Sequence, residues 1–306
     1  MQLKTTENAY AKINLMLDIT GIREDGYHLI DGVMQTVSLA DRLEVEFEVD
    51  KATRIEIRIV NGKENIPADS SNLACRAASA YLGRICKTGI VKIQLRKEIP
   101  VAAGLAGGSA DAAAVLRALN RLFGYPIGTE ELCAVGAKLG ADVPFCVRGG
   151  AMRTEGIGEK LTPCAGLPEC FLVILHRDDL PFSTPRMYAE LDRVHNRFSN
   201  HPNSAEKVEK LIQVLRKGDL SAICERMGNV FEEPAILLSN GRIEELKSLL
   251  MRQPGMMGAL MSGSGSAVFG IFAKEEDAQI ACDVLKQQPG INAWLCNPIS
   301  KEFCVC

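Results

Sequence analysis

A run of small residues, PVAAGLAGGSADAA at positions 100–113, is the first feature that points to chemistry. Gly104, Gly107 and Gly108 have no Cβ, so the backbone there can take angles and close approaches that other residues forbid. An alanine-rich helix follows, and a helix N-terminus offers unpaired N–H groups and a partial positive charge. Ser109 adds a hydroxyl donor. The stretch therefore predicts a phosphate site.

The spacing of this stretch differs from that of two familiar phosphate loops. No Gly-Lys-Ser/Thr follows it, and GLAGGSAD lacks the G-x-G-x-x-G spacing. Taken alone, the same small residues fit a close-packed helix seam equally well. A second cluster, SGSGSA at 262–267, favours the phosphate interpretation because it can present further N–H groups. An ordinary hairpin loop is the alternative for that cluster.

Lys12 and Asn14 form a second candidate group in the segment NAYAKINLMLDIT, residues 8–20. Apolar and polar residues alternate there, which predicts a strand. Because strand side chains alternate with period two, Lys12 and Asn14 share one face. The placement of Asn14 beside Lys12 favours a functional role for this face. A lysine whose stem lies along a strand edge is the structural alternative.

The elements that would position these groups can be read from periodicity. In the first half, alternating segments predict short strands at 8–20, 41–49, 54–60 and 91–100. Helical spacing appears at 72–85, from Ser109 to Phe123, and at 129–140. The Gly-rich stretch thus lies between a strand that Pro100 ends and a helix that Gly124 ends.

The second half has its own pattern. FLVILH predicts a strand at 171–176, and three helix-like stretches follow. GALMSGSGSAVFGIFA, residues 258–273, reads as strand, loop and strand, followed by a helix at 275–288 and a strand at 291–297. The region 155–168 is rich in glycine and proline, so we place a domain boundary there. The prediction is an α+β protein with domains at 1–163 and 164–306.

Composition excludes several classes of function. The chain has 306 residues, 47% hydrophobic and 24% charged, with a net charge of −3. That charge gives no electrostatic footprint for nucleic acid. No apolar run reaches the roughly 18 residues of a membrane helix. The opening MQLKTTENAYAKINL lacks the apolar core of a secretory signal, so we expect a cytoplasmic protein.

The eleven cysteines do not predict a metal site or a disulfide framework. They do not form paired C-x-x-C spacings, and an odd number without an export signal indicates reduced thiols. We therefore predict no metal-ligating residues among them.

Taken together, the glycine clusters resemble the GHMP kinase superfamily, which carries a strand–Gly-rich loop–helix and a late Gly-rich loop. Here these read PVAAGLAGGSADAA and MSGSGSAVFG. Three further segments, AKINLMLDITGIREDGYHLI, LGADVPFCVRGG and MRTEGIGEKLTP, are similar to the branch that acts on 4-diphosphocytidyl-2-C-methyl-D-erythritol. The segments occur in the family's order and span almost the whole chain.

The resemblance implies a two-domain fold with the active site in the cleft between domains. It implies a kinase that moves the γ-phosphoryl group of ATP to the 2-hydroxyl of a cytidine-diphosphate sugar alcohol, in the methylerythritol phosphate route to isoprenoids. The N-terminal domain would be ATP-binding and catalytic, and the C-terminal domain would lie on the substrate side. ATP chemistry in general implies Mg²⁺, although no dedicated carboxylate cluster identifies its ligands. We expect no nucleic-acid or membrane partner, and a monomer or weak homodimer.

The resemblance also implies residue roles. Asp142 would accept the proton of the hydroxyl, and Lys12 would stabilise charge beside it. The substrate side would comprise Asn14, Tyr27, His28, Thr184, Tyr188, Gly263, Ser264 and Gly265. The ATP side would comprise Asn72, Lys97, Pro100, Val101, Ala102, Ala103, Gly104, Leu105, Ala106, Gly107, Gly108, Ser109 and Ala110.

Each role has a structural alternative. Asp142 can cap the turn before Pro144, and Asn72 can cap a helix. Tyr27 can pack on a hairpin, with His28 exposed. Ala106 stands where many family members have glycine, which is tolerable if its backbone angle is ordinary.

Two rival functions also remain open. One is another small-molecule kinase of the superfamily, of the homoserine or mevalonate type. The other is a non-catalytic nucleotide-binding regulator on the same fold. The Gly-Tyr-His turn, residues 26–28, argues against the first rival, and the retained Lys12 and Asp142 argue against the second.

Overall fold

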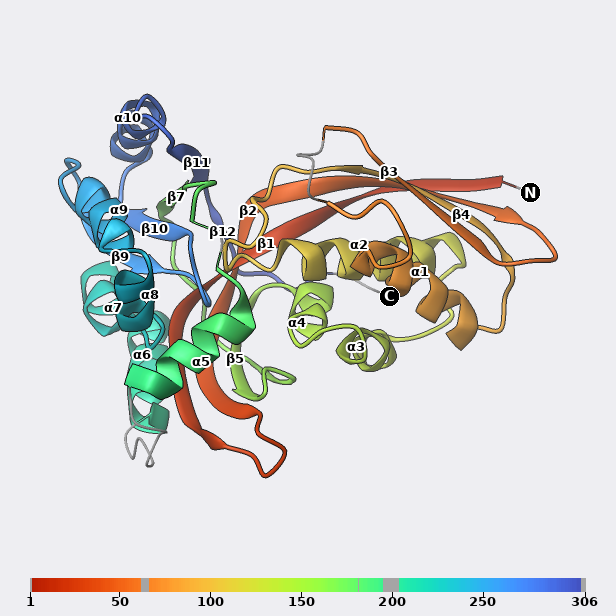
Figure 1. The fold of residues 1–306 in the computed structure, drawn as a ribbon, viewed down its shortest axis with the longest axis horizontal. Coiled ribbons are helices and arrows are strands. Elements are labelled where there is room, and N and C mark those ends of the chain that lie inside the picture. The colour runs from red at the N-terminus through yellow and green to blue at the C-terminus, as the bar shows by residue number, and fades with distance from the viewer. Residues whose placement is uncertain (1, 62–65, 181, 195–203, 304–306) are drawn as a thin grey trace.

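A computed structural model describes residues 2–61, 66–180, 182–194 and 204–303. Two sheets organise the described chain, and Figure 1 shows the larger one extending along most of the molecule. The larger sheet has the path β3-β4-β2-β1-β8, with β5 and β12 also pairing with β2, and β6 with β5. Its strands are β1 (Gln2–Ile22), β2 (His28–Val49), β3 (Arg54–Ile59), β4 (Gly89–Arg96), β5 (Ala151–Gly156), β6 (Lys160–Pro163), β8 (Gly228–Asn229) and β12 (Pro298–Ile299).

The smaller sheet is antiparallel throughout. Its order is β11 (Asn292–Cys296), β7 (Phe171–His176), β10 (Val268–Phe272) and β9 (Met256–Met261). The strand–loop–strand expected around the late glycine cluster is present as β9 and β10, which pair directly. The cluster therefore forms the connection between two neighbouring strands.

Helices pack beside both sheets (Figure 1). Those of the first half are α1 (Leu73–Arg84), α2 (Gly107–Leu122), α3 (Thr129–Ala137) and α4 (Val143–Arg148). Those of the second half are α5 (Thr184–Val194), α6 (Ser204–Lys217), α7 (Leu220–Arg226), α8 (Glu232–Leu238), α9 (Arg242–Met251) and α10 (Glu275–Lys286). Among the described residues, five helices thus lie between β7 and β9, where three were expected, because α7 and α8 have only seven residues each. Such short helices give too little periodicity to recognise.

The hairpin β1–β2 is much longer than the short strands predicted from the sequence, at 21 and 22 residues. Register shifts occur between Tyr10 and Lys12, Asn14 and Met16, and Ile19 and Gly21. Residues 11–19 are buried in succession, so both faces of this part of β1 are covered. Alternating polarity therefore does not mark a solvent face here, and Lys12 and Asn14 lie inside the protein.

The second half of the chain also contributes to the larger sheet. β8 pairs in parallel with β1 at Met16 and Leu17, and β12 pairs with β2 at Thr36 and Val37. The two predicted units, 1–163 and 164–306, are therefore joined by shared strands. The boundary between them stays a prediction.

Helix α2 is the centre of the first half. Its alanines are almost completely buried, and it packs against α1 and β1. Small side chains let these neighbours approach the helix axis closely. The close-packed seam that the sequence left open as an alternative is thus present along α2, while the glycines at its start border a cavity.

Within the described residues, no helix has the length and apolar character needed to cross a membrane. The nine cysteines in the same part of the chain are all free thiols.

Candidate active site

A cavity of about 1040 Å³ is lined by residues from both halves of the chain. Its size suits two small-molecule ligands together. Of the predicted site residues, Ala110 does not line it and is instead buried in α2. The cavity brings together Lys12, Asn14, Tyr27, His28, Asn72, Lys97, residues 100–109, Asp142, Thr184, Tyr188 and residues 263–265.

The loop between β4 and α2 meets the loop between β9 and β10 backbone to backbone. Gly104 has φ +75°, and a Cβ there would lie 2.1 Å from the carbonyl oxygen of Ser262. The N–H of Ala267 donates to the carbonyl of Ala103 at 3.0 Å. Only glycine satisfies both the angle and the space at position 104. The two glycine clusters therefore form one wall of the cavity.

The start of α2 provides the predicted cluster of main-chain donors. Ala106 precedes Gly107 as the N-cap residue and makes no side-chain cap. Helix geometry leaves the first amides, those of residues 107–109, without acceptors inside the helix. These residues line the cavity. An anion in the cavity would meet these amides and the positive end of α2.

Ala106 does not meet the condition of an ordinary backbone angle that the sequence analysis set for it. Its φ is 58° and its ψ 28°, in the left-handed region, and Ala102 also has a positive φ of 53°. Alanine costs on the order of 1 kcal/mol in this region relative to glycine. A glycine at position 106 would adopt this angle without that cost.

Lys12 lies on β1 with its side chain almost completely buried. Its Nζ donates to Asn14 Oδ1 at 2.5 Å and to the carbonyl oxygen of Gly104 at 3.0 Å. Burial lowers the pKa of Lys12, and the negative charge of Asp142 opposes that shift. Both hydrogen-bond acceptors are neutral, so a ligand that brings negative charge would stabilise the ammonium group.

Asp142 is the N-cap residue of α4, but its side chain makes no capping hydrogen bond. The structural alternative for Asp142, in which its side chain caps the turn before Pro144, is therefore not observed. The side chain borders the cavity instead. Its charge acts on Lys12 and also contributes, after burial, to raising the pKa of Tyr188 to about 12. Asp142 thus supplies negative charge between the two halves of the site.

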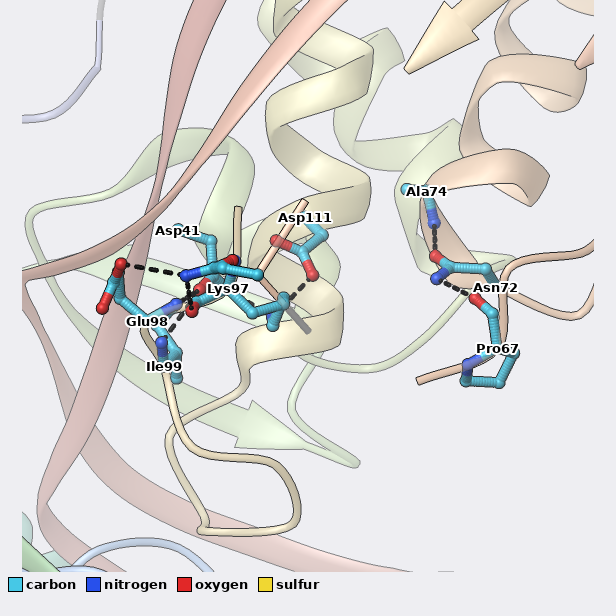
Figure 2. A network of polar contacts seen from close by, with 9 residues as sticks. Asp41, Pro67, Asn72, Ala74, Lys97, Glu98, Ile99 and Asp111 are labelled. Atoms are coloured by element: carbon cyan, nitrogen blue, oxygen red, sulfur yellow. Dashed lines mark hydrogen bonds and ion pairs between the residues drawn. The ribbon is translucent and has the colours of Figure 1, made fainter. Parts of the chain in front are cut away.

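Lys97 is held in a buried ion cluster, which Figure 2 shows from close by. Its Nζ contacts the carboxylate of Asp41 and lies 2.7 Å from Asp111 Oδ2. Burial lowers the pKa of Lys97, but Asp111 and Asp41 outweigh burial and raise it above its usual value. Asp41 also accepts from the backbone N–H groups of Glu98 and Ile99, at 2.6 and 2.8 Å. Lys97 borders the cavity, yet its charge is already paired.

Asn72 caps a helix, as its structural alternative anticipated. Its Oδ1 accepts from the N–H of Ala74 at 2.9 Å, and its Nδ2 donates to the carbonyl of Pro67 at 2.7 Å (Figure 2). Asn72 also lines the cavity. The cap therefore fixes a residue at the cavity edge, and a ligand would meet it in a set orientation.

Aromatic residues also line the cavity. His28 is largely buried rather than exposed, and its ring lies 4.6 Å from that of Tyr188. Tyr188 in turn packs edge-on against Phe231, at 4.9 Å. Tyr27 is 59% exposed at the hairpin turn, with Arg23 over its ring. His28 and Tyr188 thus pack against each other, while Tyr27 lines the cavity with an exposed ring.

Three polar residues outside the predicted set hold the late glycine loop. Ser262 Oγ donates to the carbonyl of Gly104 at 3.0 Å and accepts from the N–H of Asn14 at 3.3 Å. Asn229 Nδ2 donates to the carbonyls of Met261 and Gly263, at 2.7 and 2.8 Å. Glu232 Oε1 accepts from the N–H of Met261 at 2.8 Å.

Few sequence signals pointed to these three residues. Ser262 begins the recognised Gly/Ser cluster, which was its one signal. Asn229 and Glu232 lie in a stretch without any motif. Thr184, on the other hand, was predicted, and its Oγ1 lies 3.2 Å from Ser264 Oγ. This contact joins α5 to the late loop.

The residues that line the cavity suit the triphosphate of ATP. Main-chain donors, the end of α2 and Lys12 provide positive potential for a triphosphate. In the described part of the chain, no group of three or more His, Cys, Asp or Glu side chains is arranged to hold a metal ion. A magnesium ion that arrives with the nucleotide would meet Asp142 as a carboxylate at the cavity wall.

Comparison with known proteins indicates the same family as the sequence motifs do. The GHMP kinases N terminal domain matches residues 72–150, and the GHMP kinases C terminal domain matches residues 211–291. A 4-diphosphocytidyl-2-C-methyl-D-erythritol kinase from Caldicellulosiruptor saccharolyticus is 41% identical over 278 residues, 91% of each chain.

Solved structures agree in fold. A 4-(cytidine 5'-diphospho)-2C-methyl-D-erythritol kinase matches with a TM-score of 0.77 and 35% identity, over 96% of this chain and 99% of that one. A homoserine kinase from Cytophaga hutchinsonii matches with a TM-score of 0.74 at 18% identity, over 98% and 95% of the two chains. The second likeness is one of fold alone.

Proposed function

The chain belongs to the GHMP kinases, and we propose on this premise that it transfers the γ-phosphoryl group of ATP to the 2-hydroxyl of 4-diphosphocytidyl-2-C-methyl-D-erythritol. This reaction lies in the methylerythritol phosphate route to isoprenoid precursors. The observation that carries the proposal is one cavity lined both by the phosphate-binding features of the two glycine loops and by His28 and Tyr188. An ATP triphosphate and a cytidine base need such different surroundings.

ATP binds with its phosphates on residues 100–109. The amides at the start of α2 donate to phosphate oxygens, and the late loop, residues 263–265, closes over them. Asn72 and Lys97 border the adenosine end. Lys97 acts mainly by fixing the loop, since its charge is paired with two carboxylates. Asp142 is the carboxylate at the cavity wall that would meet a magnesium ion brought by the nucleotide, and the ion would supply positive charge against that of the phosphates.

Lys12 and Asp142 act on the reacting groups. The ammonium of Lys12 stabilises negative charge on the attacking oxygen and the transferred phosphoryl group. Asp142 orients the hydroxyl and accepts its proton as the phosphoryl group moves. Asn14 holds the Lys12 amine in place, because its Oδ1 accepts one of the amine's hydrogens. Phosphoryl transfer depends chiefly on this positioning and on charge stabilisation.

The cytidine end uses aromatic surfaces and one imidazole. Tyr188 covers one face of the base, and the exposed Tyr27 is placed at the cavity opening to cover the other. His28 reads the base edge through a ring nitrogen. Thr184 contacts Ser264 and therefore joins α5, which carries Tyr188, to the late loop.

A coupled assay of ADP formation tests the proposal. The purified protein is given ATP, Mg²⁺ and, in separate reactions, the cytidylyl substrate, homoserine or mevalonate. We expect turnover of the cytidylyl substrate, with kcat/KM for the other two lower by on the order of 10⁴ or more, because their binding leaves buried polar groups unpaired. Preferred turnover of homoserine or mevalonate would contradict the proposal.

The proposed substrates are water-soluble small molecules, so we place the reaction in the cytoplasm. The oligomeric state, monomer or weak homodimer, stays a prediction.

A further inference from the structure

Asp192, a residue outside the predicted site, contacts the predicted base-reading histidine. Its Oδ1 lies 2.7 Å from His28 Nε2. The His28 and Asp192 side chains are 10% and 31% exposed, so water competes little for the contact on the histidine side. Asp192 lines the same cavity. The contact joins α5 to the first residue of β2, which are 164 positions apart in the chain.

One turn of α5 holds the His28 ring in two ways. Tyr188 and Asp192 are four residues apart, so their side chains lie on the same face of the helix. The Tyr188 ring lies against the imidazole, with 4.6 Å between ring centroids, while Asp192 binds its edge. Ring orientation is therefore fixed both by packing and by a hydrogen bond.

We infer that Asp192 is a positioning residue that sets the tautomer of His28 and through it the preference for cytosine over uracil. The inference rests on the proposed function. An ionised carboxylate only accepts hydrogen bonds, so the proton of the neutral ring resides on Nε2. Nδ1 is then the acceptor nitrogen. Asp192 thereby decides which kind of group His28 offers to a base.

The two pyrimidine bases differ at the position where this matters. Cytosine has an exocyclic amino group, which donates hydrogen bonds, where uracil-type bases have a carbonyl oxygen, which accepts them. An acceptor nitrogen on His28 pairs with the amino group and opposes the carbonyl. The Nε2–H tautomer that Asp192 selects is therefore the one that favours a cytidylyl ligand.

The fold of α5 does not depend on Asp192. Met187 and Leu191 on this helix are completely buried, and Tyr188 packs on Phe231. These apolar contacts hold the helix to the second half of the molecule. Glu190, on the same helix, pairs with Arg193 and gives a matched acidic control.

The test compares Asp192→Ala with Glu190→Ala in steady-state kinetics. For Asp192→Ala we expect KM for the cytidylyl substrate to rise on the order of tenfold, the loss of a charge-assisted hydrogen bond, while KM for ATP stays unchanged. The ratio of kcat/KM for the cytidylyl substrate to that for its uridylyl analogue should fall by a similar factor. Glu190→Ala should match the wild type in all three quantities. An unchanged base preference in Asp192→Ala would overturn the inference.

Nitrogen-15 NMR gives a second readout that does not need the variant to be active. Wild-type His28, assigned by comparison with His28→Gln, should show the Nε2–H tautomer in the ligand-free protein. A wild-type Nδ1–H tautomer would overturn the inference even if Asp192→Ala failed to fold. Should the wild-type protein not phosphorylate the cytidylyl substrate at all, the proposed function fails, while the tautomer measurement still decides the role of Asp192.

Discussion

Two buried lysines at the cavity wall are bound in opposite ways. Lys97 contacts two carboxylates, Asp41 and Asp111, and its pKa is raised. Lys12 donates to an amide oxygen and a carbonyl oxygen, and its pKa is lowered. The first lysine completes a buried ion cluster, whereas the second has two neutral hydrogen-bond acceptors, which suits the catalytic role proposed for it. Burial alone therefore does not separate the two lysines, but the charge of their partners does.

Removing the paired lysine should have the largest effect on stability. Lys97→Met leaves two buried carboxylates without their cation, and breaking such a cluster costs about 3–5 kcal/mol of unfolding free energy. Urea denaturation measures this cost. Lys4→Met is the control, because Lys4 pairs with Glu44 and Glu46 on the surface and should be dispensable for stability. Equal stability of both variants would remove the distinction between the lysines.

Removing the other lysine should affect the reaction instead. For Lys12→Met we expect kcat to fall by about 10²–10³, as for the loss of one group that stabilises transition-state charge. Unfolding free energy should change far less than in Lys97→Met, since an unpaired buried charge is also removed. Full activity in Lys12→Met would show that Lys12, like Lys97, has a structural role and not a catalytic one.

Asp142→Asn should lower kcat on the order of 10²-fold while ATP affinity is retained, because a positioned proton acceptor is lost and the nucleotide contacts are not. Steady-state kinetics and nucleotide titration measure the two quantities separately. The same substitution removes the charge that opposes the low pKa of Lys12, so the alkaline fall in activity should move to lower pH. Unchanged turnover would exclude Asp142 from the mechanism.

Gly104→Ala tests the carbonyl to which Lys12 donates. The added methyl meets the Ser262 carbonyl oxygen at 2.1 Å in a left-handed backbone, so we expect a loss of about 2 kcal/mol in stability and a matching loss of activity. Gly108→Ala is the control, since its Cβ would lie 3.5 Å from Leu73, an ordinary contact. Thermal unfolding of the two variants makes the comparison, and similar destabilisation in both would argue against the close contact of the loops.

The smallest expected effect concerns the pH dependence of kcat/KM for ATP. Because burial lowers the pKa of Lys12 below 10.5, kcat/KM for ATP should decline as pH rises through that lowered value, where the ammonium loses its proton. Stability has the opposite sign: the folded state releases this proton before the unfolded state does, so Lys12 favours folding more as pH rises towards 10.5. Lys12→Arg, which stays charged, should remove the alkaline decline. A wild-type profile flat to pH 10 would contradict a lowered pKa.

Local pattern predicted the parts of the site but not how they are connected. The Gly-rich loop, the helix after it and the β9–β10 connection follow from residue type and period, and they lie where the sequence indicated. The contact of Gly104 with Ser262 joins residues 158 positions apart, and Lys97 meets Asp41 across 56. Such pairings are set by tertiary packing, which no local period encodes.

The length of β1 and β2 was missed for a related reason. Strand alternation is informative only when one face is solvated, and the missed part of β2 includes residues 30–37, which are buried in succession. The left-handed angle of Ala106 was likewise hidden, because alanine gives no local signal for it. Sequence patterns therefore located the glycine loops and their flanking elements better than they predicted strand lengths and backbone angles.

The same hairpin carries Lys12 on one strand and His28 at the start of the other. The strand pairing from His28 to Lys12 contains register shifts between Asn14 and Met16 and between Ile19 and Gly21, yet it joins the two residues through one hairpin. We therefore expect the hairpin to set the distance between the proposed pyrimidine and hydroxyl positions. A shortened analogue with one phosphate in place of two should seat its base and leave its hydroxyl out of reach of ATP. It would then act as a competitive inhibitor and not as a substrate. The enzyme would thus select its substrate by length as well as by base.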